Sequence, residues 1–222
     1  MNEVVLDTET TGLKVIDGHR VVEIGCIELK DLMPTKNKFH YYLNPERKVS
    51  EDALKVHGYT DEFLSKQKKF SDVVDEFLDF IDGKRLVIHN AEFDLSHLNN
   101  ELKIIGKDII KEEVIDTLQV AREKFPGSGI SLNALCKRYN IDNSRREKHS
   151  ALLDCELLSK VYINLIDQKE PKFNLNSEEI DGNQNFTISK IDYFKKIIKP
   201  TEKELNLHKE YLKREIKKNY FN

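Results

Sequence analysis

Cysteines are few in this sequence and follow no pairing pattern. Cys26, Cys136 and Cys155 are odd in number, widely spaced and outside any Cys-x-x-Cys motif. A disulfide framework needs an even set of cysteines, and a structural zinc site needs closely paired ligands. The three thiols therefore indicate buried or free side chains in a reducing cytoplasm, and neither a disulfide-stapled nor a zinc-bound fold.

Long hydrophobic runs and internal repeats are also absent. No stretch approaches the about 18 consecutive apolar residues of a membrane span. The first ten residues contain an acid at position 3, whereas a signal peptide needs a basic start and an apolar core. Hydrophobic residues still make up 39% of the 222 residues, and charged residues 34%. We expect a cytoplasmic protein with one substantial domain plus an appendage.

Positive charge is scarce in most of the chain. From Lys190 onward there are ten Lys/Arg against five Asp/Glu, so of the net charge of −3 this tail carries +5 and residues 1–189 carry −8. An acidic body attracts phosphate backbones poorly. If the chain acts on nucleic acid, we expect metal ions to offset the local charge and a partner protein to help deliver the substrate.

Strand patterns come first along the chain and then alternate with helical patterns. We expect strands at 4–6, 21–29, 39–43, 86–89 and 114–116. We expect helices at 51–65, 71–81, 91–102, 118–125, 132–139 and 151–166. The first three strands suggest an antiparallel meander. This order predicts an α/β fold with a mixed sheet flanked by helices.

Two carboxylates follow the first apolar strand, in the sequence Asp7-Thr8-Glu9. Side chains alternate along a strand, so both acids project from one face of the sheet, about 7 Å apart. A shared divalent cation would relieve their repulsion, and oxygen ligands suit Mg²⁺ or Mn²⁺. On this spacing alone, two solvated acids at the start of a loop are the simpler interpretation.

A third acid lies where a strand passes into a helix, in the sequence His89-Asn90-Ala91-Glu92-Phe93-Asp94. Asp94 falls in the first helical turn, where a carboxylate also complements the helix dipole. That role accounts for Asp94 considered singly. His89 fits a packed histidine at a strand end better than it fits a ligand.

His149 and Asp154 lie at the start of the last helix predicted before residue 170. Five residues within a helix leave two side chains about 140° apart, so His149 can act beside Asp154 only from the preceding loop. The polar run 143–148 permits that loop. Asp154 stands between two pairs of leucines, where a solvated acid is less expected. A surface-loop histidine is the alternative for His149.

The three segments VLDTETTGL, HNAEFD and HSALLD, in that order, resemble the exonuclease motifs of the DnaQ-like, DEDDh family of 3′→5′ exonucleases. The similarity extends to VHGYTDEF, FPGSGISLNALCKRYNID and HSALLDCELLSKVY. It covers residues 3–166 and looks closest to the epsilon proofreading subunits of bacterial DNA polymerase III. The resemblance implies an RNase H-like fold with a mixed five-stranded sheet, and removal of mismatched 3′-terminal nucleotides from DNA.

The resemblance also implies the reacting groups. Two divalent cations, Mg²⁺ or Mn²⁺, would be held by four acids: Asp7, Glu9, Asp94 and Asp154. Asp7 would lie between both cations, with Glu9 and Asp154 on one and Asp94 on the other. His149 would take the proton of the attacking water. Because clustered carboxylates repel, we expect replacement of Asp7 or Asp154 to leave the fold intact or slightly more stable.

Contacts to the terminal nucleotide are implied as well. A residue of the loop after the third strand, matched by Asp52, and the histidine of the VHG segment, His57, would help hold the 3′ nucleotide together with Asp7, Glu9 and Asp154. The family usually has glutamate at the first position. His57 is alternatively a helix-terminal residue next to Gly58. The base or sugar is expected to contact residues among Thr10, Phe63 and Phe93.

The chain divides by composition into an exonuclease domain at 1–168, a linker at 169–189 and a tail at 190–222. Gln168–Phe173 occupies the place of a sliding-clamp-binding motif, but Pro171 stands at its aliphatic position, and a plain linker fits equally. The tail resembles the segment that ties epsilon subunits to the polymerase catalytic (alpha) subunit. One helical stripe would hold Leu205, Leu212, Ile216 and Tyr220. Packing against the domain's own core is the alternative for this helix.

Two rival functions remain open at this point. The first keeps the chemistry and changes the substrate, as in an RNA 3′ exonuclease of the oligoribonuclease or RNase T type. Those proteins are usually compact, and the C-terminal extension counts against them. The second is a non-catalytic adaptor between polymerase and clamp. Retention of four mutually repelling acids and the histidine counts against it.

Overall fold

The computed structural model describes residues 2–166 and 200–215. The chain forms two units, Met1–Phe173 and Asn174–Asn222, which are described separately below. Three of the features predicted from the sequence lie outside the described residues: the linker at 169–189, the segment Gln168–Phe173 and the end of the tail stripe at Ile216 and Tyr220.

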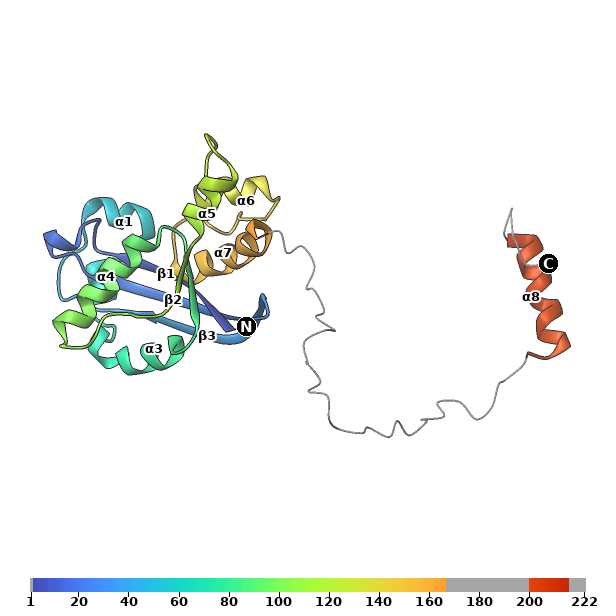
Figure 1. Ribbon diagram of the computed structural model, residues 1–222, viewed down its shortest axis with the longest axis horizontal. Helices are drawn as coiled ribbons and strands as arrows, with labels where there is room; N and C mark the ends of the chain where they lie inside the picture. Colours follow the sequence, from blue (N-terminus) through green and yellow to red (C-terminus); the bar gives the residue numbers. More distant parts are fainter. Residues whose placement is uncertain (1, 167–199, 216–222) are drawn as a thin grey trace, which may run out of the picture. The chain divides into compact units, whose positions relative to one another are not determined.

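The first unit is built on one five-stranded sheet (Figure 1). Its strands are β1 (Asn2–Thr10), β2 (Val21–Lys30), β3 (Met33–Tyr42), β4 (Arg85–Ile88) and β5 (Val114–Asp116). Their order across the sheet is β3-β2-β1-β4-β5. Antiparallel pairing joins β1 to β2 and β2 to β3, whereas β4 runs parallel to β1 and β5 parallel to β4. The predicted meander and the mixed five-stranded sheet are confirmed.

Seven α-helices are described in this unit. They are α1 (Glu51–His57), α2 (Asp61–Leu64), α3 (Val74–Ile81), α4 (Ala91–Ile104), α5 (Thr117–Lys124), α6 (Leu132–Arg138) and α7 (Ala151–Leu165). The single helix predicted at 51–65 is two helices. Gly58 ends α1 in the left-handed region at φ 81°, a conformation that favours glycine, and Thr60 caps α2 by accepting from the amide of Phe63 at 3.2 Å.

Side chains of β1 alternate between two hydrophobic clusters. Val4 and Leu6 pack in a cluster with residues of α3 and α4, whereas Val5 packs in a second cluster with residues of α5, α6 and α7. All three valine and leucine side chains are fully buried. Because alternate residues of a strand share a face, Asp7 and Glu9 continue the row of Val5 and face the α7 side of the sheet.

The second unit contains the helix α8 (Glu202–Glu215). Thr201 and Glu204 cap its start reciprocally: the Thr201 amide donates to Oε2 of Glu204 at 2.7 Å, and the Glu204 amide donates to Oγ1 of Thr201 at 3.4 Å. Leu205, Leu207 and Tyr211 are 44%, 58% and 60% exposed. Across residues 2–166 and 200–215, no helix combines the length and the apolar character needed to cross a membrane.

Candidate active site

The carboxyl-terminal half of β1 carries two of the predicted acids, Asp7 and Glu9, and is hydrogen-bonded to a third, Asp94. Glu9 is 8% exposed on this strand. Between Asp7 and Glu9, the backbone amide and the hydroxyl of Thr8 both donate to Oδ1 of Asp94, at 2.9 and 2.7 Å. These two bonds fix the first turn of α4 against β1, so the third acid is brought to the same end of the sheet.

The position of Asp94 depends on the way α4 begins. Asn90 precedes the helix in the left-handed region, at φ 74°. The carboxylate of Asp116, at the end of β5, accepts from the amides of Asn90 at 3.1 Å and Ala91 at 3.3 Å. His89 is half-buried, with its Nδ1 2.9 Å from Oγ1 of Thr117. It therefore lies as a packed histidine at the strand end.

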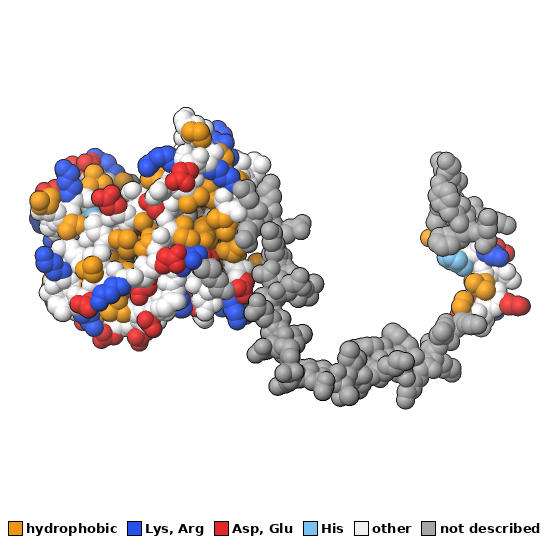
Figure 2. All heavy atoms as spheres, in the orientation of Figure 1, with side chains coloured by type: hydrophobic (Ala, Val, Ile, Leu, Met, Phe, Trp, Pro, Cys, Tyr) orange, Lys and Arg blue, Asp and Glu red, His pale blue; other side chains and the backbone are white. Residues whose placement is uncertain are grey.

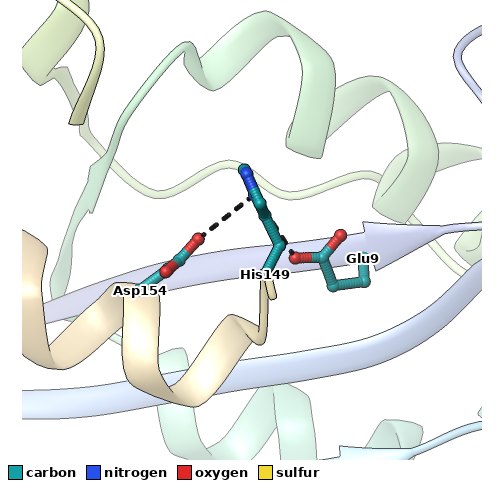
Figure 3. A group of neighbouring side chains, drawn as sticks. All are labelled: Glu9, His149 and Asp154. Carbon is teal, nitrogen blue, oxygen red and sulfur yellow. Dashed lines mark ion pairs between the residues drawn. The ribbon is translucent and has the colours of Figure 1, made fainter. Parts of the chain in front are cut away.

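The fourth acid and the histidine come from the start of α7. The helix begins at Ala151, so His149 lies on the preceding loop, as the spacing predicted. Asp154 is buried in the first turn. Nδ1 of His149 lies 3.5 Å from Oδ2 of Asp154 and 4.0 Å from Oε1 of Glu9 (Figure 3). The structure thus brings all three of these side chains together.

Close packing of α7 on β2 requires the glycine at position 25. A Cβ atom at Gly25 would lie 2.6 Å from the carbonyl carbon of Ala151, well inside van der Waals contact. The thiol of Cys155 also donates to the Gly25 carbonyl oxygen at 3.1 Å. The N-terminal turn of α7, which carries Asp154, therefore lies directly on the sheet.

A cationic side chain lies within the acid cluster. Arg146 donates from Nε to Oδ1 of Asp154 at 2.5 Å and from Nη2 to Oδ2 at 2.6 Å. Nη2 also lies 2.9 Å from Nδ1 of His149. Both partners of the ion pair are buried, with side chains 6% and 4% exposed. This buried, two-pronged pair partly offsets the negative charge of the cluster.

Burial, with the charges of neighbouring acids, raises the pKa values of Asp7, Glu9 and Asp94. Burial raises the pKa of Asp7 well above its ordinary value, and the charges of Asp94, Asp154 and Glu9 add to the effect. Burial, followed by the charge of Glu23, raises the pKa of Glu9 to about 8. Burial raises the pKa of Asp94 to about 7, although the bonds from Thr8 oppose the shift. The cluster therefore keeps an excess of negative charge even with Arg146 beside Asp154.

The donor set fits a hard divalent cation. Glu9, His149 and Asp154 each offer one ligand atom, and these atoms lie within 4.8 Å of one another. All four acids and His149 line a single pocket of about 550 Å³. The ligand atom of His149 is a ring nitrogen, whereas the four acids offer carboxylate oxygens, which are the ligands that Mg²⁺ and Mn²⁺ prefer. A cation bound there would also supply the positive charge that the buried carboxylates lack.

An adjoining pocket of about 530 Å³ shares Glu9 and contains the predicted nucleotide contacts Asp52 and His57. Asp52 lies in the first turn of α1 and not in a loop, and its 95% exposed side chain pairs with Lys55 at 3.1 Å. His57 is buried and accepts from the Tyr59 amide at 2.9 Å. Thr10 and Phe93 line this pocket.

Phe63, the third residue expected near the base or sugar, lies elsewhere. Its ring packs against Tyr42 and Tyr59, with centroid distances of 5.1 and 5.9 Å. The separation of α1 from α2 turns Phe63 toward these two tyrosines.

Two charged residues of the site were not predicted from the sequence. Arg146 belongs to the polar run that was interpreted only as a loop. Glu23 is fully buried on β2, in a strand otherwise apolar around it. An acid within a strand such as Val21-Val22-Glu23-Ile24 was an available signal, because a charge is rarely buried there without partners.

Comparisons with known proteins agree with this geometry. The family model described as "Exonuclease" (RNase T type) matches residues 4–162. The DNA polymerase III subunit epsilon of Rickettsia felis is 43% identical over 219 residues, covering 96% of each chain. That of Salmonella typhimurium is 49% identical over 169 residues, which are 72% of this chain and 70% of the relative.

Solved structures show the same fold. Exonuclease X, in complex with 5′ overhanging duplex DNA, has a TM-score of 0.60 at 25% identity and covers 75% of this chain and 92% of its own. The nuclease domain of 3′hExo, a DEDDh family member bound to rAMP, has a TM-score of 0.66 at 16% identity, with coverages of 76% and 92%. Exonucleases of this family depend on divalent metal ions. The chain therefore belongs to the DEDDh exonuclease family, in the group of DNA polymerase III epsilon subunits.

Proposed function

We propose that this chain removes mismatched 3′-terminal nucleotides from DNA as the proofreading subunit of a replicative DNA polymerase. One observation carries the proposal: four acids from β1, α4 and α7 line one pocket together with His149. A scaffold without catalysis would gain nothing from gathering carboxylates such as Asp7 and Glu9, whose pKa values are raised first by burial and then by neighbouring charges.

The acids would hold two divalent cations, either Mg²⁺ or Mn²⁺. Asp7, Glu9, Asp94 and Asp154 would together hold these ions. When bound, the ions would lower the pKa of the attacking water and stabilise charge on the departing oxygen. Arg146 has to share Asp154 with an ion or give it up, because it donates to both carboxylate oxygens.

His149 is the proposed general base. It lies at the mouth of the pocket with its side chain 46% exposed, and burial and the Arg146 charge lower its pKa below the ordinary value. A neutral imidazole can accept the proton of the water that attacks the last phosphodiester. The bond between phosphorus and the 3′ oxygen breaks, and that oxygen takes up a proton. The products are a nucleoside 5′-monophosphate and a chain shortened by one nucleotide.

The adjoining pocket is the proposed site of the terminal nucleotide. His57 and Asp52 contact that nucleotide in this proposal, with Asp7, Glu9 and Asp154 near its phosphate. Thr10 and Phe93 offer surface for the sugar and base. The two pockets share Glu9, Val56 and Phe93, so a nucleotide in one brings its phosphate to the acids in the other.

The proposed partner contacts lie in the segments that follow α7. Residues 190–222 bind the polymerase catalytic (alpha) subunit in this proposal, and Gln168–Phe173 contacts the sliding clamp, in the bacterial cytoplasm. The face in Figure 2 shows acidic and basic side chains interspersed over the first unit, not gathered into one basic surface. A surface of mixed charge attracts DNA weakly. Attachment to a polymerase would instead keep the nuclease at a high local concentration beside the primer end.

A comparison of substrates tests the proposal against its rivals. The measured quantity is the rate of shortening of 5′-labelled DNA and RNA oligonucleotides of one sequence, each annealed with a matched or mismatched 3′ end, in Mg²⁺ and in EDTA. The proposal predicts metal-dependent shortening that is faster on DNA and faster at the mismatch. Preference for RNA would support the oligoribonuclease type. No shortening of either would support the adaptor.

A further inference from the structure

Glu23 is a buried residue of the sheet that accepts hydrogen bonds both from the residues after His149 and from Tyr59. It is fully buried on β2, opposite Glu9 in the pairing of β1 with β2. Both oxygens are saturated. Oε1 accepts from Nε2 of His40 at 2.7 Å and from Oγ of Ser150 at 3.1 Å. Oε2 accepts from the Tyr59 hydroxyl at 2.7 Å and from the Ala151 amide at 2.9 Å.

Two of these four donors directly follow His149 in the sequence. Ser150 is the residue before α7, and its side chain makes no hydrogen bond that caps the helix; it donates to Glu23 instead. The Ala151 amide is one of the first amides of the helix, which have no partner inside it. The backbone amide of His149 donates to the Val56 carbonyl at 3.2 Å. The His149 loop is thus held by α1 on one side and by Glu23 on the other.

A third donor, the Tyr59 hydroxyl, connects Glu23 to the proposed nucleotide pocket. Tyr59 stacks on His57 with ring centroids 4.7 Å apart. One carboxylate therefore contacts both the loop of the proposed base and the residue packed on a proposed nucleotide contact. Hydrogen bonds from His40, Ala151 and Tyr59 lower the pKa of Glu23 against the effect of its burial, so it stays ionised and keeps accepting all four.

We propose that Glu23 is a positioning residue for His149: it holds the Ser150–Ala151 backbone so that the imidazole reaches the attacking water. This inference rests on the proposed function of His149. A misplacement of about 1 Å in a catalytic group can cost on the order of 100-fold in rate. Glu23→Gln keeps the side-chain shape but replaces one acceptor oxygen by a donor, which faces two of the four donors. We expect kcat at saturating DNA to fall about 10- to 100-fold.

A double-mutant cycle separates positioning from a loss of stability. Glu23→Gln is measured in the wild-type background and in His149→Ala. If Glu23 acts through His149, the substitution lowers kcat strongly in the first background and less than about threefold in the second. If Glu23→Gln lowers kcat by the same factor in both backgrounds, the proposal is overturned, because Glu23 would then act on the fold or on another group.

The matched control is Glu101→Gln. Glu101 is also a buried carboxylate with several donors, since it accepts from Arg20 Nε at 2.6 Å and from the Val21 amide at 3.2 Å. These partners lie on and just before β2 and not on the His149 loop, so the effect of Glu101→Gln on kcat should be equal in both backgrounds. A coupling to His149 as large as that of Glu23 would contradict a specific role for Glu23.

Ser150→Ala provides a second test if Glu23→Gln lowers the folded fraction. It removes only the 3.1 Å bond to Oε1 and leaves the carboxylate in place. We expect a several-fold loss of kcat that disappears in His149→Ala, and a loss that persists there would overturn the proposal. Unchanged kcat in His149→Ala alone is a different result: it would remove the base from the proposed function, and Glu23's role with it.

Discussion

Arg146 and Asp154 form a two-pronged ion pair inside the acid cluster, with Nε–Oδ1 and Nη2–Oδ2 distances of 2.5 and 2.6 Å. The same guanidinium lies 2.9 Å from Nδ1 of His149. One side chain therefore neutralises a proposed metal ligand and contacts the proposed base. A divalent cation that binds Asp154 competes with Arg146 for its oxygens.

Arg146→Gln should lower the folding stability of the metal-free protein and increase its affinity for a divalent cation. Removing one partner of a buried ion pair costs about 3–5 kcal/mol of folding free energy. The cation no longer competes with the guanidinium, so we expect its Kd to fall about tenfold, which corresponds to about 1.4 kcal/mol. Thermal unfolding in EDTA and calorimetric titration with Mn²⁺ measure the two effects.

The neighbouring Arg145→Gln is the control for that substitution. Its side chain is 78% exposed and pairs with Glu156 at 3.5 Å, so neither Tm nor the Kd for Mn²⁺ should change appreciably. An unchanged Kd in Arg146→Gln, or an equal change in both variants, would contradict competition at Asp154.

Asp7→Asn and Asp154→Asn should differ in stability although both abolish nuclease activity. Burial, and then the charges of four other acids, raise the pKa of Asp7, so removing its charge relieves both costs and should raise Tm in EDTA. Asp154→Asn leaves the buried Arg146 without its carboxylate and should lower Tm. The sequence alone predicted the same effect for both residues. Equal shifts in Tm would support that simpler prediction.

Stability in EDTA should fall as pH rises from about 5 to 8. Folding raises the pKa of Glu9 from 4.5 to about 8 and that of Asp94 from 3.8 to about 7. Between the ordinary and the raised values, the folded protein holds protons that the unfolded chain has lost, so increasing pH favours unfolding. Saturating Mg²⁺ should flatten the curve. Tm that rises over this range in EDTA would contradict the raised pKa values.

His149→Ala should lower kcat by about 10²–10⁴ without preventing binding of DNA or metal. The pKa of His149 is lowered, so the acidic limb of the pH–rate profile should lie below the ordinary histidine value and flatten in the variant. His208→Asn is the control, because His208 is exposed on α8 and is not a lining residue of the pocket that the acids line. Unchanged kcat with weaker DNA binding in His149→Ala would assign this histidine to substrate positioning.

Deletion of residues 190–222 should leave hydrolysis of free single-stranded DNA nearly unchanged and abolish binding to the polymerase subunit. Leu205, Leu207 and Tyr211 of α8 are exposed and offer apolar surface to a partner. Co-purification with the polymerase subunit and the rate on a free oligonucleotide check the two parts. Unfolding of the truncated protein, or loss of its nuclease activity, would make the tail part of the catalytic domain.

Local periodicity explains why much of the fold was predictable. The alternation of Val5, Asp7 and Glu9 on one face of a strand follows from the two-residue repeat, and the loop position of His149 follows from the helical rotation to Asp154. The break between α1 and α2 could have been predicted as well, since Gly58 and Thr60 are typical helix-ending and helix-capping residues.

The pairing of buried charges was not predictable in the same way. Ser150 and Glu23 are 127 residues apart in the sequence, and their hydrogen bond depends on the packing of α7 against β2. Arg146 lies only eight residues before Asp154, yet its position depends on a loop that has no periodic pattern. Such contacts come from tertiary structure, which hydrophobic patterning does not specify.

The central claim is that the acid cluster catalyses metal-dependent removal of nucleotides from the 3′ end of DNA. The most direct measurement follows single-stranded DNA carrying a 5′ label and, separately, a 3′ label, with the wild type and Asp7→Asn in Mg²⁺. We predict that the wild type shortens the 5′-labelled strand one nucleotide at a time and releases the 3′ label at once as a mononucleotide, and that Asp7→Asn does neither. Activity of Asp7→Asn within tenfold of the wild type, or release of the 5′ label first, would contradict the account.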